Sequence, residues 1–316
     1  MKKLATFAVI MLIAGIIGVF MTFKVQDLKT FGTEAVLMEK SIDSKDIQNI
    51  KVDSDSLNIE LKRSATNDIK VSIDGRASKK YVDRFELTAE AEGDTAKIHA
   101  DYKDVFFVGF NYVDVDLVIE LPDRLWDSIE LDSKHSNIDI EHLTVKEAVI
   151  TLGSGNIDTD ELQAGNVKLT ASHGNMDLEN VIGDNVELQS SSGNIKLETY
   201  SVGQLKVHSD HGNITIEDGV GAVQGSTKSS NIRFNSDELN DNVSLKTDHG
   251  NIRLEVERQP ESAEIVVKHK HGNRDIDWKG IEASMDTEHA YSGKLGSGAI
   301  KIEAESETGN IKLGID

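Results

Sequence analysis

Residues 154–216 read SGNIDTDELQAGNVKLTASHGNMDLENVIGDNVELQSSSGNIKLETYSVGQLKVHSDHGNITI, and the block Gly-Asn-Ile or a near copy returns in them every 19 residues. The same block recurs with looser spacing toward the C-terminus. The asparagines of the copies are Asn137, Asn156, Asn175, Asn194, Asn213, Asn231, Asn251, Asn273 and Asn310. A repeat of nearly constant length indicates one structural unit stacked on itself many times.

Two runs of alternating apolar and polar residues accompany each asparagine. One follows it, as in Ile195 and Leu197, and the other precedes it, as in Val186 and Leu188. Alternation with a period of two indicates strands with one buried face. Two short strands cannot bury that face alone, but coils stacked about 4.8 Å apart bury it continuously. We therefore predict an all-β fold, a right-handed parallel β-solenoid (β-helix). The alternative is an antiparallel meander, which does not need a constant period.

The Gly-Asn step suits a sharp corner, because both residues tolerate a positive φ. Equivalent asparagines one coil apart would also form a ladder of side-chain amides, each donating to the next. We interpret the step as structural rather than as a ligand contact.

The segment before the repeat also contains short strand-like runs. We predict an irregular N-terminal β module over residues 46–125, which caps the open edge of a solenoid domain over residues 126–316. Residues 53–59 (DSDSLNI) resemble a degenerate copy of the repeat corner, and the aromatic residues 106–110 suit a core plug or an exposed contact surface. The strand-like runs are residues 50–52, 57–61, 69–73, 85–87, 97–100 and 113–121.

The N-terminus predicts a membrane anchor. Residues 4–23 (LATFAVIMLIAGIIGVFMTF) carry no charge, and a helix of that length spans about 30 Å, the thickness of a bilayer core. Lys2 and Lys3 favour a cytoplasmic N-terminus with the rest of the chain outside. A cleaved signal peptide is the alternative, but the stretch is long and lacks a small-x-small site. We expect a single-pass signal anchor over residues 1–23 and a juxtamembrane stalk, partly helical, over residues 24–45.

The composition limits the partners. The 316 residues carry a formal net charge of −21 and no cysteine, so disulfides, thiolate metal sites and cysteine nucleophiles are excluded. So acidic a surface repels nucleic acid and anionic lipid headgroups. It is compatible with cations, basic peptides or neutral glycans.

The order of anchor, β module and (Ser/His)-Gly-Asn-Ile coils resembles a bacterial family usually labelled "putative adhesins", with SGNI- or HGNI-type repeats. Its best-known members include the LiaG-type membrane-anchored proteins of envelope-stress operons. The resemblance covers nearly the whole chain. It implies a β-solenoid, surface exposure and an association with envelope stress, and it implies no catalytic residue or cofactor.

An acidic column is the first candidate site. The fourth residue after the asparagine is acidic in most coils, and a shorter column of Asp139, Asp158 and Asp177 lies beside it. Stacked carboxylates repel one another, so a solvated face, neighbouring lysines or weakly bound divalent cations or cationic peptides would have to offset the repulsion. The column consists of Glu141, Asp160, Glu179, Glu198, Glu217 and Glu255, interrupted by Asn235.

Histidines form the second candidate site. His135, His173, His211 and His249 recur every 38 residues, which places them two coils apart and too far from each other to share a metal. His249 and His271, with His269 nearby, form the expected pair on adjacent coils. Histidine also tolerates turn conformations, so a structural role competes with metal binding or pH sensing.

The sequence contains no Gly-x-Ser-x-Gly, zinc-helix, P-loop or dinucleotide-binding pattern. We therefore predict a protein that is not an enzyme and has no cofactor, with a binding or scaffolding role at the cell envelope. Its partner would be an envelope protein or a cell-wall glycan. The alternatives are a glycan-active β-helix enzyme and an adhesin that binds a surface polysaccharide.

Overall fold

The computed structural model describes residues 32–103 and 112–315, which contain strands and one short 3-10 helix, η1 (Val82–Arg84). The strands of the N-terminal part are β1 (Thr33–Asp43), β2 (Asn49–Ser54), β3 (Asn58–Ser64), β4 (Asp68–Ser78), β5 (Phe85–Glu92), β6 (Thr95–Tyr102) and β7 (Val113–Pro122). The middle part consists of β8 (Trp126–His135), β9 (Ile138–Ser154), β10 (Ile157–His173), β11 (Met176–Ser192), β12 (Ile195–Ser209) and β13 (Ile214–Thr227). The C-terminal part consists of β14 (Ile232–Ser236), β15 (Val243–His249), β16 (Ile252–Val256), β17 (Ala263–His271), β18 (Arg274–Ile276), β19 (Glu282–Asp286), β20 (Ala290–Leu295), β21 (Ile300–Thr308) and β22 (Ile311–Ile315).

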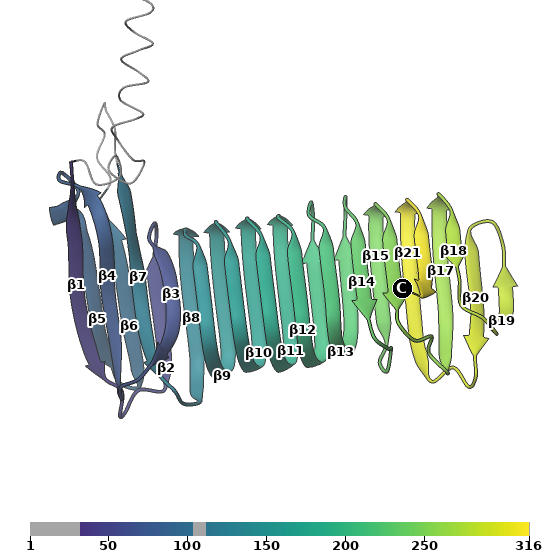
Figure 1. Ribbon diagram of the computed structural model, residues 1–316, viewed down its shortest axis with the longest axis horizontal. Helices are drawn as coiled ribbons and strands as arrows, with labels where there is room; N and C mark the ends of the chain where they lie inside the picture. The colour runs from purple at the N-terminus through teal and green to yellow at the C-terminus, as the bar shows by residue number, and fades with distance from the viewer. Residues whose placement is uncertain (1–31, 104–111, 316) are drawn as a thin grey trace, which may run out of the picture.

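The strands stack into one elongated rod, with β1 at one end and β19 at the other (Figure 1). Each of β9 to β13 makes most of a coil, and neighbouring coils pair in parallel. Ile157 of β10 pairs with Ile138 of β9 on one side and with Met176 of β11 on the other. The parallel solenoid is confirmed, and an antiparallel meander is excluded for these coils. The right-handed winding stays a prediction.

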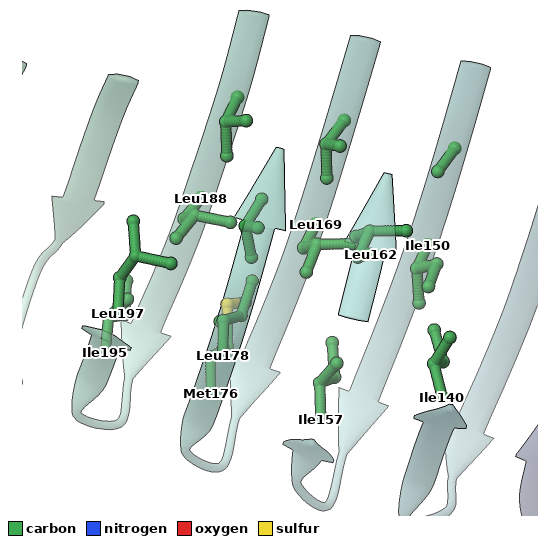
Figure 2. Packing of buried hydrophobic residues seen from close by; sticks show 14 of the residues in the cluster. Ile140, Ile150, Ile157, Leu162, Leu169, Met176, Leu178, Leu188, Ile195 and Leu197 are labelled. Atoms are coloured by element: carbon green, nitrogen blue, oxygen red, sulfur yellow. The ribbon is translucent and has the colours of Figure 1, made fainter. Parts of the chain in front are cut away.

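The interior of the rod consists of columns of aliphatic side chains, one from each coil (Figure 2). Burying a side chain of this size stabilises a fold by about 1.5–3 kcal/mol, so each added coil extends the core by several such contributions. One column contains Ile138, Ile157, Met176, Ile195 and Ile214, each at most 1% exposed.

The N-terminal strands close one end of the rod. Antiparallel strands β1, β4 and β7 close one side of this end, and the antiparallel pair β5 and β6 closes the other. β2 pairs in parallel with β8, and β3 pairs in parallel with β9. The stacked coils therefore begin at β2 and β3, before the expected boundary at residue 126, and the predicted copy of the corner at residues 53–59 lies between these two strands.

The predicted stalk is wrong in its second half. β1 pairs antiparallel with β4 from Thr33 to Asp43, because Val36 and Ile42 turn inward and are buried in the cap. In the part of the chain that the structure describes, no helix is long and apolar enough to cross a membrane. The predicted anchor (residues 1–23) and the aromatic residues 106–110 lie outside the described residues.

The C-terminal coil does not stack in sequence order. β21 pairs in parallel with β15 on one side and with β17 on the other, and β22 lies in the same way between β16 and β18. The last coil of the chain is thus inserted between two earlier ones. The antiparallel strands β20 and β19 then close the far end beside β17.

A ladder of asparagines runs along the rod. At each step the backbone N–H of one asparagine donates to Oδ1 of the asparagine on the coil before it, over 2.8–3.1 Å. Side-chain Nδ2 groups contribute to only three of these steps. The predicted ladder is confirmed, but it is mainly backbone to side chain. Its spatial order is Asn58, Asn137, Asn156, Asn175, Asn194, Asn213, Asn231, Asn251, Asn310 and Asn273.

The corner glycine is required mainly by close approach. A Cβ on Gly174 would lie 1.7 Å from the carbonyl oxygen of Gly155, and one on Gly193 would lie 1.8 Å from that of Gly174. The ladder asparagines do not have a positive φ, contrary to expectation. The left-handed residues other than glycine lie at a second corner, five residues after the asparagine. They are His142, Glu161, Asn180, Thr199 and Asp218, with φ between 53° and 57°.

Replacing Gly193 by alanine should strongly destabilise the stack, because the coils would have to separate to admit the new Cβ. We expect a loss of about 3 kcal/mol or more in the free energy of unfolding, measured by chemical denaturation. Gly93→Ala is the control. Gly93 has a φ of +64° and no atom within 4 Å of a built Cβ, so only left-handed strain of about 1 kcal/mol applies. Equal losses would contradict the close-approach explanation.

Substitutions of Asn194 distinguish a ladder of backbone N–H to side-chain oxygen bonds from a ladder of side-chain amide bonds. Its Oδ1 accepts the backbone N–H of Asn213 at 2.9 Å, so Asn194→Ala should cost about 1 kcal/mol. Asn194→Asp keeps an acceptor oxygen and should retain most of the stability at neutral pH. Thermal or denaturant unfolding of the two variants measures the difference. If aspartate is as harmful as alanine, the side-chain amide nitrogen matters instead.

Candidate binding faces of the rod

The rod has two broad faces, the first face and the second face. The first face is the outer surface of β3, the N-terminal parts of β9 to β13, and β14, β16, β22 and β18. The second face is the outer surface of β2, β8, the C-terminal parts of β9 to β13, and β15, β21 and β17. Both faces present the same repeat position at every coil.

The predicted acidic column lies on the first face. Asp160 pairs with Glu141 and Glu179, and Glu198 pairs with Glu179 and Glu217, so these five side chains stack in register. Asp139, Asp158 and Asp177 stack beside them. Burial raises the pKa of Asp158, and the charges of Asp177 and Asp139 raise it further.

Lys196 offsets part of the repulsion further along the column. Lys196 contacts Glu198 at 2.8 Å and lowers the pKa of Glu198. Burial, together with the neighbouring Glu198 carboxyl group, raises the pKa of Glu217. From β12 onward the shorter column that begins with Asp139, Asp158 and Asp177 is no longer acidic. Its next members are Lys196, Thr215, Arg233 and Arg253.

Glu255 ends the acidic column as a buried ion pair. Its side chain is 1% exposed, with Arg253 Nε at 2.5 Å and Lys312 Nζ at 2.8 Å from its two carboxylate oxygens. Hydrogen bonds from Arg253 and Lys312 lower the pKa of Glu255 to about 2. Lys312 belongs to β22, so this carboxylate joins the inserted C-terminal coil to β16.

Neither predicted site forms a metal centre by itself. Among residues 32–103 and 112–315, no three His, Asp or Glu side chains are placed to hold a metal ion. Cation binding by Glu141, Asp160, Glu179, Glu198 and Glu217 stays a prediction.

The predicted histidine pair is wrong. His249 and His271 both pair with Thr308, from opposite sides, because β21 lies between β15 and β17. A whole coil therefore separates the two side chains. His269 instead lies 7% exposed with its ring centroid 6.1 Å from that of His289. Burial, followed by the charges of Arg274 and His289, lowers the pKa of His269.

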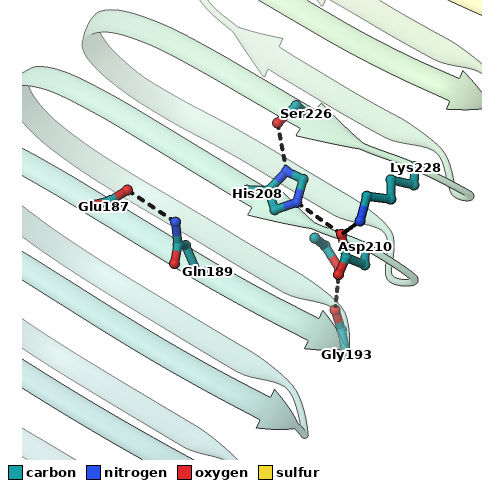
Figure 3. A network of polar contacts seen from close by, with 8 residues as sticks. Glu187, Gln189, Gly193, His208, Asp210, Ser226 and Lys228 are labelled. Carbon is teal, nitrogen blue, oxygen red and sulfur yellow. Dashed lines mark hydrogen bonds and ion pairs between the residues drawn. The ribbon is translucent and has the colours of Figure 1, made fainter.

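The second face holds a polar network that sequence reasoning missed (Figure 3). His208 Nδ1 lies 2.8 Å from Ser226 Oγ, and His208 Nε2 lies 3.1 Å from Asp210 Oδ1. Lys228 Nζ lies 2.6 Å from Asp210 and, together with His208, lowers its pKa. His208 and Ser226 are 18 residues apart, which is the length of the coil at this point, so they lie side by side on adjacent coils. This spacing is the sequence signal for the contact.

The order Ser226, His208, Asp210 is that of a nucleophile with its base, but the surroundings do not suit acyl transfer. The strand around Ser226 pairs with β12 on one side and with β15 on the other. Its backbone N–H groups are therefore engaged in the sheet rather than available to an oxyanion. Lys228 also neutralises the carboxylate. The network is best explained as a polar contact that joins two coils.

Two of the hollows on the described surface are larger than the others. One, of about 860 Å³, is bordered by the turns at residues 43–45, 63–67 and 122–124. Its Arg63 pairs with Asp123, and Arg124 donates to the carbonyl of Ser44 at 2.8 Å. The other is a groove of about 660 Å³ on the second face, which crosses the coils from β9 to β15 and β21. Exposed amides line much of it, including Asn166, Asn185, Gln204 and Asn242.

Glu255→Gln should show how far the buried ion pair holds the C-terminal coil. The lowered pKa means that Glu255 stabilises the fold above its ordinary pKa of 4.5, and that this stability is lost as the pH falls through about 2. The variant should be less stable at neutral pH and should lack that acid-dependent loss. Denaturation midpoints between pH 7 and pH 2 measure both effects, with Glu141→Gln as the exposed control from the same column. Identical pH profiles for the wild type and Glu255→Gln would contradict the assignment.

Several solved structures are similar to this chain at low identity. A "putative cell adhesion protein" from Clostridium sporogenes is 12% identical, covering 90% of this chain and 100% of its own, with a TM-score of 0.25. A "putative adhesin" from Bacteroides fragilis is 15% identical, covering 87% and 96%, with a TM-score of 0.43. Another "putative adhesin", from Parabacteroides merdae, is 13% identical, covering 70% and 92%, with a TM-score of 0.35.

No curated protein matches the sequence. The family profile described as "Toastrack DUF4097" matches residues 47–314, from just before β2 almost to the end of β22. This range contains every stacked coil. The chain therefore belongs to the Toastrack DUF4097 family.

Proposed function

We propose that this protein is a non-catalytic binding or scaffolding rod, anchored in the bacterial cytoplasmic membrane by residues 4–23 and exposed outside the cell. The regularity of its faces is the observation that carries the proposal. Equivalent positions stack in register from coil to coil on both faces, whereas catalysis needs a few irregular residues converging in a cleft. The Ser226, His208 and Asp210 network lacks such surroundings.

The arrangement of the rod suits an anchor at its N-terminal end. β1 begins at Thr33 in the cap, and β19 lies at the opposite end (Figure 1). The nine residues 24–32 span at most about 30 Å, at roughly 3.3–3.6 Å per residue. An anchor ending at residue 23 would thus hold the cap near the membrane and leave the hairpin of β19 and β20 as the distal tip. The net charge of −21 would keep the rod from lying on anionic headgroups.

The resemblance to LiaG-type proteins supports a more specific role within an envelope-stress module. In that role the rod would hold a partner protein at a fixed distance from the membrane. A second candidate function, an adhesin that binds a surface polysaccharide, is favoured by the amide-lined groove of the second face. A glycan-cleaving enzyme has no comparable support among the described side chains.

The full chain with a C-terminal epitope tag tests the anchor and its orientation. We expect the protein to sediment with membranes, to dissolve only in detergent, and to lose the tag when protease is added outside intact spheroplasts. Replacing Ile10 and Ile16 together by aspartate should release it, because charged residues at the centre of a spanning helix cost several kcal/mol. A tag protected from external protease, or a wild-type chain in the soluble fraction, would overturn the proposal.

A further inference from the structure

We infer that the groove of the second face binds a linear, uncharged polysaccharide in extended form, with about one sugar unit over each coil. The inference rests on the proposed binding role and adds the ligand class and the place. It is independent of the acidic column on the first face, which faces away from the groove.

The groove is built from three neighbouring positions of each coil. The first position is an exposed column that pairs in register, from Glu147 through Asn166 and Asn185 to Gln204. The middle position turns its apolar side chain into the core, as in Val167 and Val186, so it lies beneath the groove without offering that side chain to a ligand. The third position points outward again. Its members along the groove are Val149, Lys168, Glu187, Lys206, Gln224, Ser244 and Glu303.

The amides are the main recognition groups. A carboxamide offers two donors and two acceptor lone pairs, which suits the mixed donor and acceptor character of sugar hydroxyls. Asn185 Nδ2 donates to Asn166 Oδ1 at 2.9 Å, and Asn242 Oδ1 accepts the backbone N–H of Lys301 at 2.8 Å. These bonds orient the amides, and they use only part of the hydrogen-bonding capacity of each side chain.

Charge in the groove is balanced, in contrast to the whole chain. Three lysines and three glutamates line it, whereas the chain has a net charge of −21. Glu187 lies 2.9 Å from Lys206 and 3.8 Å from Lys168, and Lys301 lies 2.6 Å from Glu303. Because these charges pair with each other, the groove offers little attraction to an ionic polymer. The acidic remainder of the rod repels polyanions.

The spacing of the coils favours a glycan over a peptide. Coils follow one another at about 4.8 Å, a distance comparable to the length of one pyranose unit in an extended chain. A sugar polymer laid across the coils therefore meets an equivalent position of the groove at each unit, and this position carries an amide on three successive coils, at Asn166, Asn185 and Gln204. An extended peptide advances about 3.3 Å per residue and would lose register within a few coils. Across the seven coils of the groove, six steps give a length of about 29 Å.

Titration of the detergent-solubilised full chain with defined oligosaccharides tests the inference. The probes are cello- and chito-oligosaccharides of two to six units, with a neutral Ser/Thr-rich peptide and alginate oligomers as comparisons. We expect affinity to rise with the length of the neutral oligosaccharide. Asn185→Ala and Gln204→Ala should each weaken binding by about five- to tenfold. Gln163→Ala removes an exposed amide outside the groove and should leave binding within about twofold. Thermal melting confirms that each variant is folded.

Three results would overturn the inference: no binding of any neutral oligosaccharide, equal effects of Gln163→Ala and Asn185→Ala, or tighter binding of the peptide or alginate. The measurement is made in detergent, so it does not depend on membrane orientation. Mass spectrometry of the recovered oligosaccharide separates the two proposals. Shortened products would refute the non-catalytic function while leaving the groove as the binding site.

Discussion

The rod depends on how closely one coil can approach the next at the Gly-Asn corner. The corner glycines pass so near the carbonyl oxygens of the preceding coil that a Cβ would lie 1.7–2.1 Å from them. The backbone N–H of the following asparagine then bonds to the side chain of the coil before it. Together these contacts fix both the spacing and the rotation of each coil. Because the corner sets the register, the inward aliphatic residues superpose into a continuous core and the outward residues superpose into columns. The regular columns of side chains on both faces thus follow from the packing at the corner.

Stacking in register brings like charges close together wherever a charged residue recurs on successive coils. Along the first face, this repulsion is offset in some coils and not in others. Asp139, Asp158 and Asp177 stack as like charges, and burial followed by the charges of its two neighbours raises the pKa of Asp158. Lys196 and Arg253 instead pair with the neighbouring glutamates. On the second face, lysine and glutamate alternate between coils at Lys168, Glu187 and Lys206, so attraction replaces repulsion. The same architecture therefore carries one strongly acidic surface and one that is electrically balanced.

The repeat in the sequence was sufficient to predict the stacked coils and the copy of the corner that contains Asn58, because a 19-residue period leaves few ways to align equivalent side chains. It was not sufficient where contacts depend on the order of the coils in space. The pairing of His249 with Thr308 follows from the insertion of β21, and the spacing to the next Asn block predicts a simple continuation instead. β1 was missed because Val36 and Ile42 are too far apart to give an alternating pattern. The contact between His208 and Ser226 was missed because each residue is ordinary within its own coil. The ladder was predicted with the wrong donor, since a sequence does not show whether a side chain bonds to another side chain or to the backbone.

The insertion of the last coil has a consequence for biosynthesis. A simple solenoid can grow coil by coil as the chain emerges from the ribosome, each coil templating the next. Here β15 and β17 are synthesised before the strand that lies between them, β21. The far end of the rod therefore cannot take its final form until the chain is nearly finished. A product that stops before residue 300 would leave open strand edges on both sides of an empty slot, and such edges promote aggregation. The distal end of the rod can therefore close only after β21 and β22 have been synthesised.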